Sequence, residues 1–66
     1  MTLDSLVSLL DLQINTCKSD IIISTVFVSQ MPDSFQTTRK LLKAAIDENT
    51  EYMHELILIK DILLGN

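Results

Sequence analysis

The residues that come closest to a reactive group are His54 and the two carboxylates near it. His54 is the only histidine in the sequence, Glu51 lies three positions before it, and Asp61 lies seven positions after it. One imidazole with two carboxylates is a weak pattern for a metal site, because such sites ordinarily include a second imidazole or a thiolate. We therefore interpret His54 as a solvated side chain and expect neither a metal ion nor any other cofactor.

Cys17 is the only cysteine, which excludes an internal disulfide and a cysteine-based metal cage. Lys18 follows it, but adjacent side chains on a helix point in different directions, so nothing activates the thiol. Acid–base catalysis requires an enclosed pocket, which two helices do not offer to the nine carboxylates. The single glycine, Gly65, excludes a glycine-rich phosphate loop. The sequence therefore indicates a protein that is not an enzyme, with Cys17 in its core.

The overall charge argues against a general affinity for nucleic acids or anionic lipids, because the formal net charge is −4 and the sequence pI is about 4.5. Three of the five cations, Arg39, Lys40 and Lys43, lie close together. Acidic residues flank them at Asp33 and from Asp47 onward, which is typical of a solvated helix face. A DNA- or RNA-binding patch is the alternative interpretation, and it predicts binding that weakens steeply with salt.

No segment has the length of a membrane span. The most apolar block, residues 21–28, is interrupted by Ser24 and Thr25, and it is much shorter than the roughly 20 residues that cross a bilayer. The N-terminus carries Asp4 where a secretory signal would have basic residues. We therefore expect no membrane insertion and no secretory signal.

A heptad pattern dominates the second half of the chain and predicts a helix over about residues 34–64. Its members alternate steps of three and four residues, the spacing of a helix face that packs against another helix. They are Phe35, Thr38, Leu42, Ala45, Asn49, Tyr52, Leu56, Ile59 and Leu63. The same phase continues through the polar segment 47–50, which favours one unbroken helix. Asn49 either fixes the register against a polar partner or faces water.

The first half carries a similar pattern and predicts a helix over about residues 3–30, with Thr2 as its N-cap. Its heptad positions are Leu3, Val7, Leu10, Ile14, Cys17, Ile21, Ser24, Val28 and Met31. Residues 21–29 are mostly β-branched and favour a strand by propensity, but a lone strand would leave its backbone groups unpaired. We therefore predict that the helix continues through them.

Pro32 separates the two helices, because proline disfavours helical geometry in the preceding residue and lacks an amide donor. We expect a turn at about residues 31–33, with Asp33 and Gln36 forming a variant of the capping box. Gly65 marks the end of the second helix. A short connection makes the helices antiparallel neighbours. The sequence thus predicts an all-α fold, a single antiparallel two-helix hairpin over residues 1–66 with a coiled-coil-like seam.

The chain is more apolar than a two-helix unit can hide. Hydrophobic residues make up 47% of it and the mean hydropathy is +0.30, whereas a domain of this size buries only about 60% of its unfolded surface. A second apolar line on the first helix either broadens the seam or binds a partner, and self-association or a permanent partner is the leading inference. That line consists of Leu9, Leu12, Ile23 and Val26. The candidate partner-binding residues are Leu9, Leu12, Ile23, Val26, Phe27, Phe35 and Met53.

The entry to the second helix resembles a known family. The segment Pro32-Asp33-Ser34-Phe35-Gln36, followed by a helix with the aliphatic run 56–59, is similar to the small co-chaperones of the bacterial type III secretion needle subunit. In that family the second helix often begins with Pro-x-x-aromatic-Gln. The resemblance implies a helical hairpin in the bacterial cytoplasm that forms a stable heterodimer with a tetratricopeptide-like chaperone. Together the two proteins would cover the needle subunit and prevent it from polymerising early.

A different hypothesis rests on the apolar excess alone. A homodimeric four-helix bundle would hide the same surfaces and would suit a regulatory or adaptor protein unrelated to secretion. The co-chaperone hypothesis predicts co-purification with a tetratricopeptide-like chaperone. The homodimer hypothesis predicts that the chain alone sediments as more than a monomer.

Overall fold

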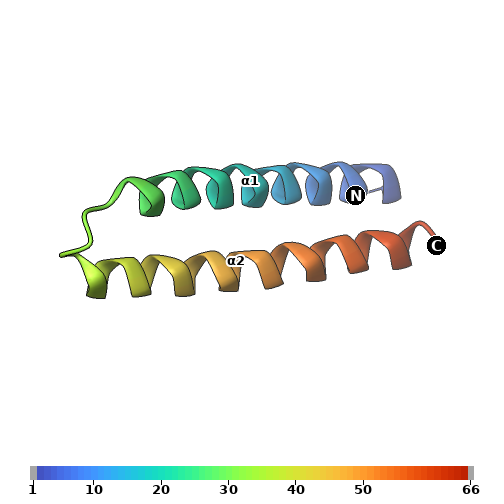
Figure 1. The fold of residues 1–66 in the computed structure, drawn as a ribbon. Coiled ribbons are helices and arrows are strands. Elements are labelled where there is room, and N and C mark those ends of the chain that lie inside the picture. Colours follow the sequence, from blue (N-terminus) through green and yellow to red (C-terminus); the bar gives the residue numbers. More distant parts are fainter. Residues whose placement is uncertain (1, 66) are drawn as a thin grey trace.

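The fold is a hairpin of two long helices, seen in a computed structural model that describes residues 2–65. Helix α1 spans Leu3–Gln30 and helix α2 spans Gln36–Leu63. The helices run antiparallel and lie side by side along their length, with the start of α1 and the end of α2 at the same end of the rod (Figure 1). The molecule measures 49 × 17 × 14 Å, so it is one layer of helices thick. The predicted all-α hairpin is confirmed.

Helix α1 begins at the predicted cap and continues through the β-branched segment. The Thr2 hydroxyl oxygen accepts a hydrogen bond of 3.1 Å from the Ser5 backbone amide, which satisfies one of the free donors of the first turn. Further along, the Thr25 hydroxyl donates to the Ile21 carbonyl at 2.7 Å, and the Ser29 hydroxyl donates to the Val26 carbonyl at 2.7 Å. These side chains satisfy their polar groups on their own helix, so the segment is helical despite its strand propensity.

Helix α2 begins at Gln36, two residues later than predicted, and its N-cap position is occupied by Phe35 without a side-chain hydrogen bond. The expected capping box of Asp33 with Gln36 is wrong. The Asp33 carboxylate instead accepts a hydrogen bond of 3.1 Å from the Arg39 guanidinium, which also donates to the Met31 carbonyl at 3.3 Å. Arg39 therefore joins both ends of the turn, and we call this arrangement the Arg39 clamp.

The far end of α2 stops where glycine predicted it. Gly65 has a φ of +76°, in the left-handed region that favours glycine, and its amide donates to the Ile62 carbonyl at 3.1 Å. Between Gln36 and this end α2 is one helix, and the polar segment 47–50 does not interrupt it. The prediction of a single continuous second helix is confirmed.

The seam of α1 follows the predicted heptad pattern. Ile14, Cys17 and Val28 are buried. The neighbouring heptad positions are half-buried, and they are Val7, Leu10, Ile21, Ser24 and Met31. Leu3 departs from the pattern because it lies at the open end of the hairpin, where it is exposed. Cys17 is only 2% exposed, as its interpretation as a core residue requires.

The seam of α2 agrees with the prediction at only four of nine positions. Leu42, Asn49, Leu56 and Leu63 face α1 and are half-buried or buried, whereas Phe35, Thr38, Ala45, Tyr52 and Ile59 are exposed. The intervening seam positions are instead Ile46, Met53 and Lys60. Both choices keep a heptad spacing, so the pattern alone could not distinguish them. Asn49 is half-buried at the seam.

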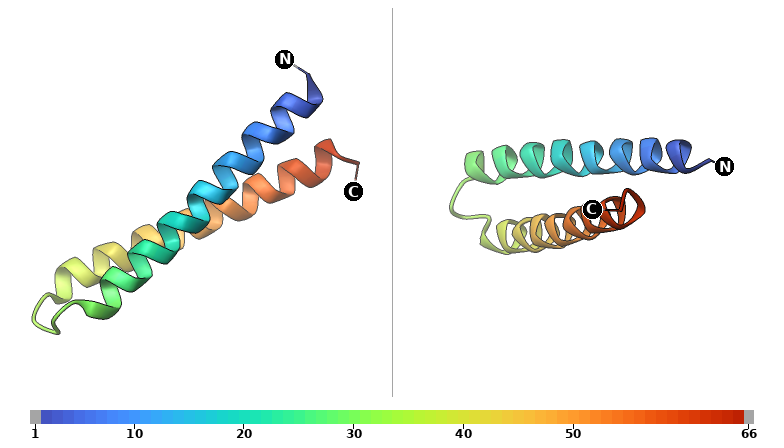
Figure 2. Two further views of the ribbon diagram at one scale, coloured as in Figure 1. Left: turned by 90° about the horizontal axis from the view of Figure 1, so that it is seen from above. Right: turned by 90° about the vertical axis from the view of Figure 1, so that its right-hand side faces the viewer.

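An ion pair across the seam is consistent with the phase of α2. The Lys60 ammonium pairs with the Asp11 carboxylate of α1, and the two side chains are 30% and 47% exposed. Because adjacent residues on a helix diverge by about 100°, a Lys60 that reaches α1 leaves Ile59 facing outward. The view from above in Figure 2 shows that the two helices cross one another rather than run strictly parallel.

The buried core is small for so apolar a chain. Ile14, Cys17 and Leu56 form its centre, and the half-buried side chains of Leu10, Met53 and Ile57 pack against them. The accessible surface is 5000 Å². A compact monomer of 7.5 kDa would expose about 4250 Å², so the hairpin exposes roughly 750 Å² more than its mass requires.

Candidate protein-interaction surface

The groups considered for catalysis or metal binding do not come together. His54 and Glu51 are exposed and Asp61 is half-buried. Across residues 2–65, no group of three His, Cys, Asp or Glu side chains lies close enough to hold a metal ion. Cys17 is a free thiol enclosed in the core. The candidate site must therefore be sought among surfaces rather than reactive groups.

The basic residues lie beside the turn. Arg39, Lys40 and Lys43 line a shallow pocket of about 370 Å³ together with Gln36 and Asp33. Arg39 is held by the clamp, and its side chain is 28% exposed while that of Asp33 is 99% exposed. Part of the positive charge is thus paired inside the hairpin, and the two lysines are exposed.

The five predicted partner-binding residues of α1 are all exposed, and four of them form an apolar face on the side away from α2. We call these four the outer face of α1, namely Leu9, Leu12, Ile23 and Val26, whereas Phe27 lies at the turn. Leu9 and Leu12 border a shallow hollow of about 520 Å³ together with Asp4, Ser5 and Ser8. The separate, second apolar line that the spacing predicts therefore remains uncovered by the hairpin itself.

The other two predicted partner-binding residues have different positions. Phe35 is exposed at the turn, while Met53 packs against the core cluster of Ile14, Cys17 and Leu56. Placing Met53 on the exposed surface depended on the predicted phase of α2, in which Tyr52 and not Met53 faces α1. We therefore remove Met53 from the candidate surface.

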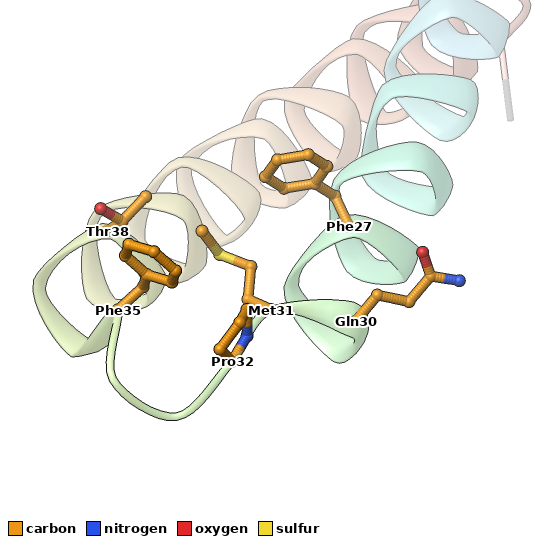
Figure 3. Close-up of a pocket in the computed structure, with 6 residues that line it drawn as sticks. All are labelled: Phe27, Gln30, Met31, Pro32, Phe35 and Thr38. Carbon is orange, nitrogen blue, oxygen red and sulfur yellow. The ribbon is translucent and has the colours of Figure 1, made fainter.

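Phe27 and Phe35 come together in a pocket at the turn. With Met31, Gln30, Pro32 and Thr38 they line a hollow of about 500 Å³ that is mainly apolar. Figure 3 shows the Met31 side chain lying between the two phenyl rings, with Pro32 below it. The sequence analysis named both phenylalanines as partner-binding candidates but did not predict that they line one pocket. The available signal was their position on either side of Pro32, where a tight turn brings flanking residues close.

A further exposed apolar line on α2 was missed because the sequence analysis assigned three of its five residues to the seam. We call it the α2 stripe, and it consists of Leu41, Ala45, Tyr52, Ile59 and Ile62. Glu48 and Glu55 lie between these residues on the same side of the helix. The hairpin thus carries two uncovered apolar surfaces, one on each helix.

Neither α1 nor α2 combines the length and the apolar character that crossing a membrane requires. Comparison of the chain with protein-family models, with curated proteins and with solved structures gives no match.

Proposed function

We propose that the chain is a non-enzymatic co-chaperone of bacterial type III secretion, which works in the cytoplasm. In this proposal it stabilises a tetratricopeptide-like chaperone as a heterodimer, and the pair keeps the needle subunit unpolymerised. The observation that carries the proposal is the outer face of α1, together with the resemblance of the segment Pro32-Asp33-Ser34-Phe35-Gln36 to that family.

The outer face suits a helical-repeat partner. Repeat proteins of this kind stack helix pairs into a concave surface, which accommodates a straight helix presenting an apolar face. Full burial of one large aliphatic or aromatic side chain contributes about 1.5–3 kcal/mol, before the cost of association is subtracted. Leu12 and Ile23 are the most exposed members of the face, so we expect them to dominate the affinity.

In this proposal the protein needs no reactive group. Its role in the complex is to cover apolar surface, and α2 holds α1 straight by packing along its length. The four hydroxyl groups that bond back to their own helix belong to Thr16, Thr25, Ser29 and Thr50. Three of these lie on α1, so burial against a partner would leave none of these three hydroxyl groups unpaired.

Co-expression tests this proposal. The chain should co-purify in equal amounts with a tetratricopeptide-like chaperone encoded beside it, and the pair should keep the co-expressed needle subunit soluble. Leu12→Asp should weaken that complex at least about tenfold, because it places a charge in an apolar contact. The matched control is Leu41→Asp on α2, since the two leucines are 64% and 68% exposed. Failure of the unmodified chain to co-purify, or equal effects of the two variants, would contradict the proposal.

A further inference from the structure

We infer that a second copy of this chain docks on the α2 stripe, with the two α2 helices antiparallel, to form a four-helix bundle. The two-fold axis passes near residue 50. This inference concerns a surface that the proposed function leaves free, and it stands independently of that function. Four features of the described residues support it: the spacing of the stripe, the positions of its carboxylates, the distribution of charge along α2, and the area left exposed.

The spacing of the stripe is self-complementary. Together with Thr38, Glu48 and Glu55, which have the same spacing, the stripe occupies positions 38, 41, 45, 48, 52, 55, 59 and 62, and the steps of three and four read the same from either end. A two-fold axis requires each contact to occur twice, with the roles of the two residues exchanged. In an antiparallel pair centred at position 50, Leu41 faces the second copy's Ile59, and Thr38 faces the second copy's Ile62. The middle of α2 coincides with this centre, so the helices overlap along their full length.

The two carboxylates within the stripe exclude the parallel alternative. In a parallel two-fold pair each residue faces its own copy, so Glu48 would face Glu48 and Glu55 would face Glu55. Like charges at such short separation oppose association. In the antiparallel pair Glu48 faces the second copy's Tyr52, and Glu55 faces the second copy's Ala45. Both carboxylates then lie beside uncharged side chains of the second copy.

The charge along α2 favours the same direction. Residues 36–45 contain Arg39, Lys40 and Lys43 and no carboxylate. Residues 46–58 contain four carboxylates and no cation, namely Asp47, Glu48, Glu51 and Glu55. With the axis near residue 50, antiparallel docking sets residues 36–45 of each α2 beside residues 55–64 of the other, which contain Glu55, Lys60 and Asp61, whereas parallel docking sets the two basic segments side by side. The carboxylates of residues 47–51 lie near the axis in both arrangements, so charge distinguishes the two directions only toward the ends of α2. Complementary charge across an interface fixes orientation and register.

The two ends of the rod also match in shape. The turn end carries the apolar pocket between Phe27 and Phe35 (Figure 3). Thr38, which has the same spacing as the stripe, also lines this pocket. The open end carries exposed aliphatic side chains at Leu6, Ile62 and Leu64. Antiparallel docking brings the open end of each copy to the pocket of the other, so an aliphatic side chain fills a hollow lined by aromatic rings. The same contact forms twice.

The exposed area is of the size that such a contact needs. The hairpin exposes roughly 750 Å² more than a compact monomer of its mass, and each partner in a standard protein–protein interface contributes about 800 Å². Docking through the stripe therefore brings the exposed surface to the ordinary value, while the outer face of α1 stays available.

Sedimentation equilibrium and disulfide trapping test this arrangement. The unmodified chain should sediment as a dimer. Leu41→Asp should raise the dissociation constant of the dimer about 100-fold, because each of the two copies carries the substitution and each contributes roughly tenfold. Leu12→Asp, the matched control on the outer face of α1, should leave the dimer unchanged. A monomeric unmodified chain, or a dimer lost in Leu12→Asp but retained in Leu41→Asp, would overturn the inference.

Trapping reports the direction of the helices without relying on affinity. The single variants Thr38→Cys and Ile62→Cys should each form few intermolecular disulfides when oxidised alone. When the two variant proteins are mixed and oxidised, a disulfide should form between them. The unmodified chain serves as the background, because Cys17 is enclosed in the core. Efficient self-linking of Thr38→Cys would show a parallel pair and overturn the inference. Circular dichroism of each variant checks that it remains helical. The chaperone test distinguishes the two proposals, since it responds to Leu12→Asp and the dimer responds to Leu41→Asp.

Discussion

The two helices have the same length but use their apolar residues differently. In α1 the predicted heptad line is the seam, and a separate apolar face points outward. In α2 the predicted line is divided, with Leu42 and Leu56 facing α1 while Tyr52 and Ile59 face solvent. This difference shows the limit of a heptad pattern. The pattern identifies the packed side of a helix only when the residue after each heptad position is polar. Two phases compete in α2 because four of these residues are apolar, namely Ile46, Met53, Ile57 and Leu64.

Substitutions at two adjacent positions of α2 should have the largest difference in effect and test which side of this helix packs against α1. Ile46→Asp buries a charge at the seam and should lower the free energy of unfolding by about 3 kcal/mol. Ala45→Asp, one residue earlier on the exposed stripe, should cost about 0.5 kcal/mol through helix propensity. Urea unfolding of the two variants, at concentrations too low for association, measures both values. The reverse order would restore the predicted seam and remove the stripe.

A smaller effect separates the inside of α2 from its outside without adding charge. Leu56→Ala removes a side chain from the core cluster and should lower the free energy of unfolding by about 2 kcal/mol or more. Leu58→Ala makes the same chemical change at an exposed position and should change it by less than about 0.5 kcal/mol. Thermal unfolding followed by circular dichroism compares the two. Similar melting temperatures would mean that the core cluster does not hold the hairpin together.

The smallest expected effect concerns the ion pair between Asp11 and Lys60, which forms when this side of α2 faces α1. The ion pair of Asp11 with Lys60 is partly exposed, so a double-mutant cycle with Asp11→Asn and Lys60→Gln should give a coupling energy of about 0.5 kcal/mol. That coupling should decrease as salt is added. A coupling near zero at low salt would mean that packing alone, and not the ion pair, sets the phase of α2.

Much of the fold follows from particular residues. Pro32 predicts the turn, Thr2 and Gly65 predict the helix ends, and the heptad pattern of α1 predicts its seam. The start of α2 could not be predicted, because Arg39 competes for the Asp33 carboxylate and the sequence does not show which partner it takes.

The sequence likewise predicted some parts of the candidate surface and missed others. The outer face of α1 followed from residue spacing, because each of its members falls far from the seam on any helical reading. Met53 was misplaced and the α2 stripe was missed for one shared reason, the phase of α2. The pocket of Phe27 and Phe35 depends on the path of the turn, which local propensity does not determine.

The Arg39 clamp has a consequence for the order in which the hairpin closes. It joins residues six and eight positions apart, whereas the pair of Asp11 and Lys60 joins residues 49 positions apart. Closing the longer loop from an open chain costs roughly 1.5 kcal/mol more in chain entropy than closing the shorter one. Once the clamp has formed, each successive seam contact extends a loop that is already closed. We therefore expect the hairpin to close from its turn, so that the open end is the last part to form and the first to separate.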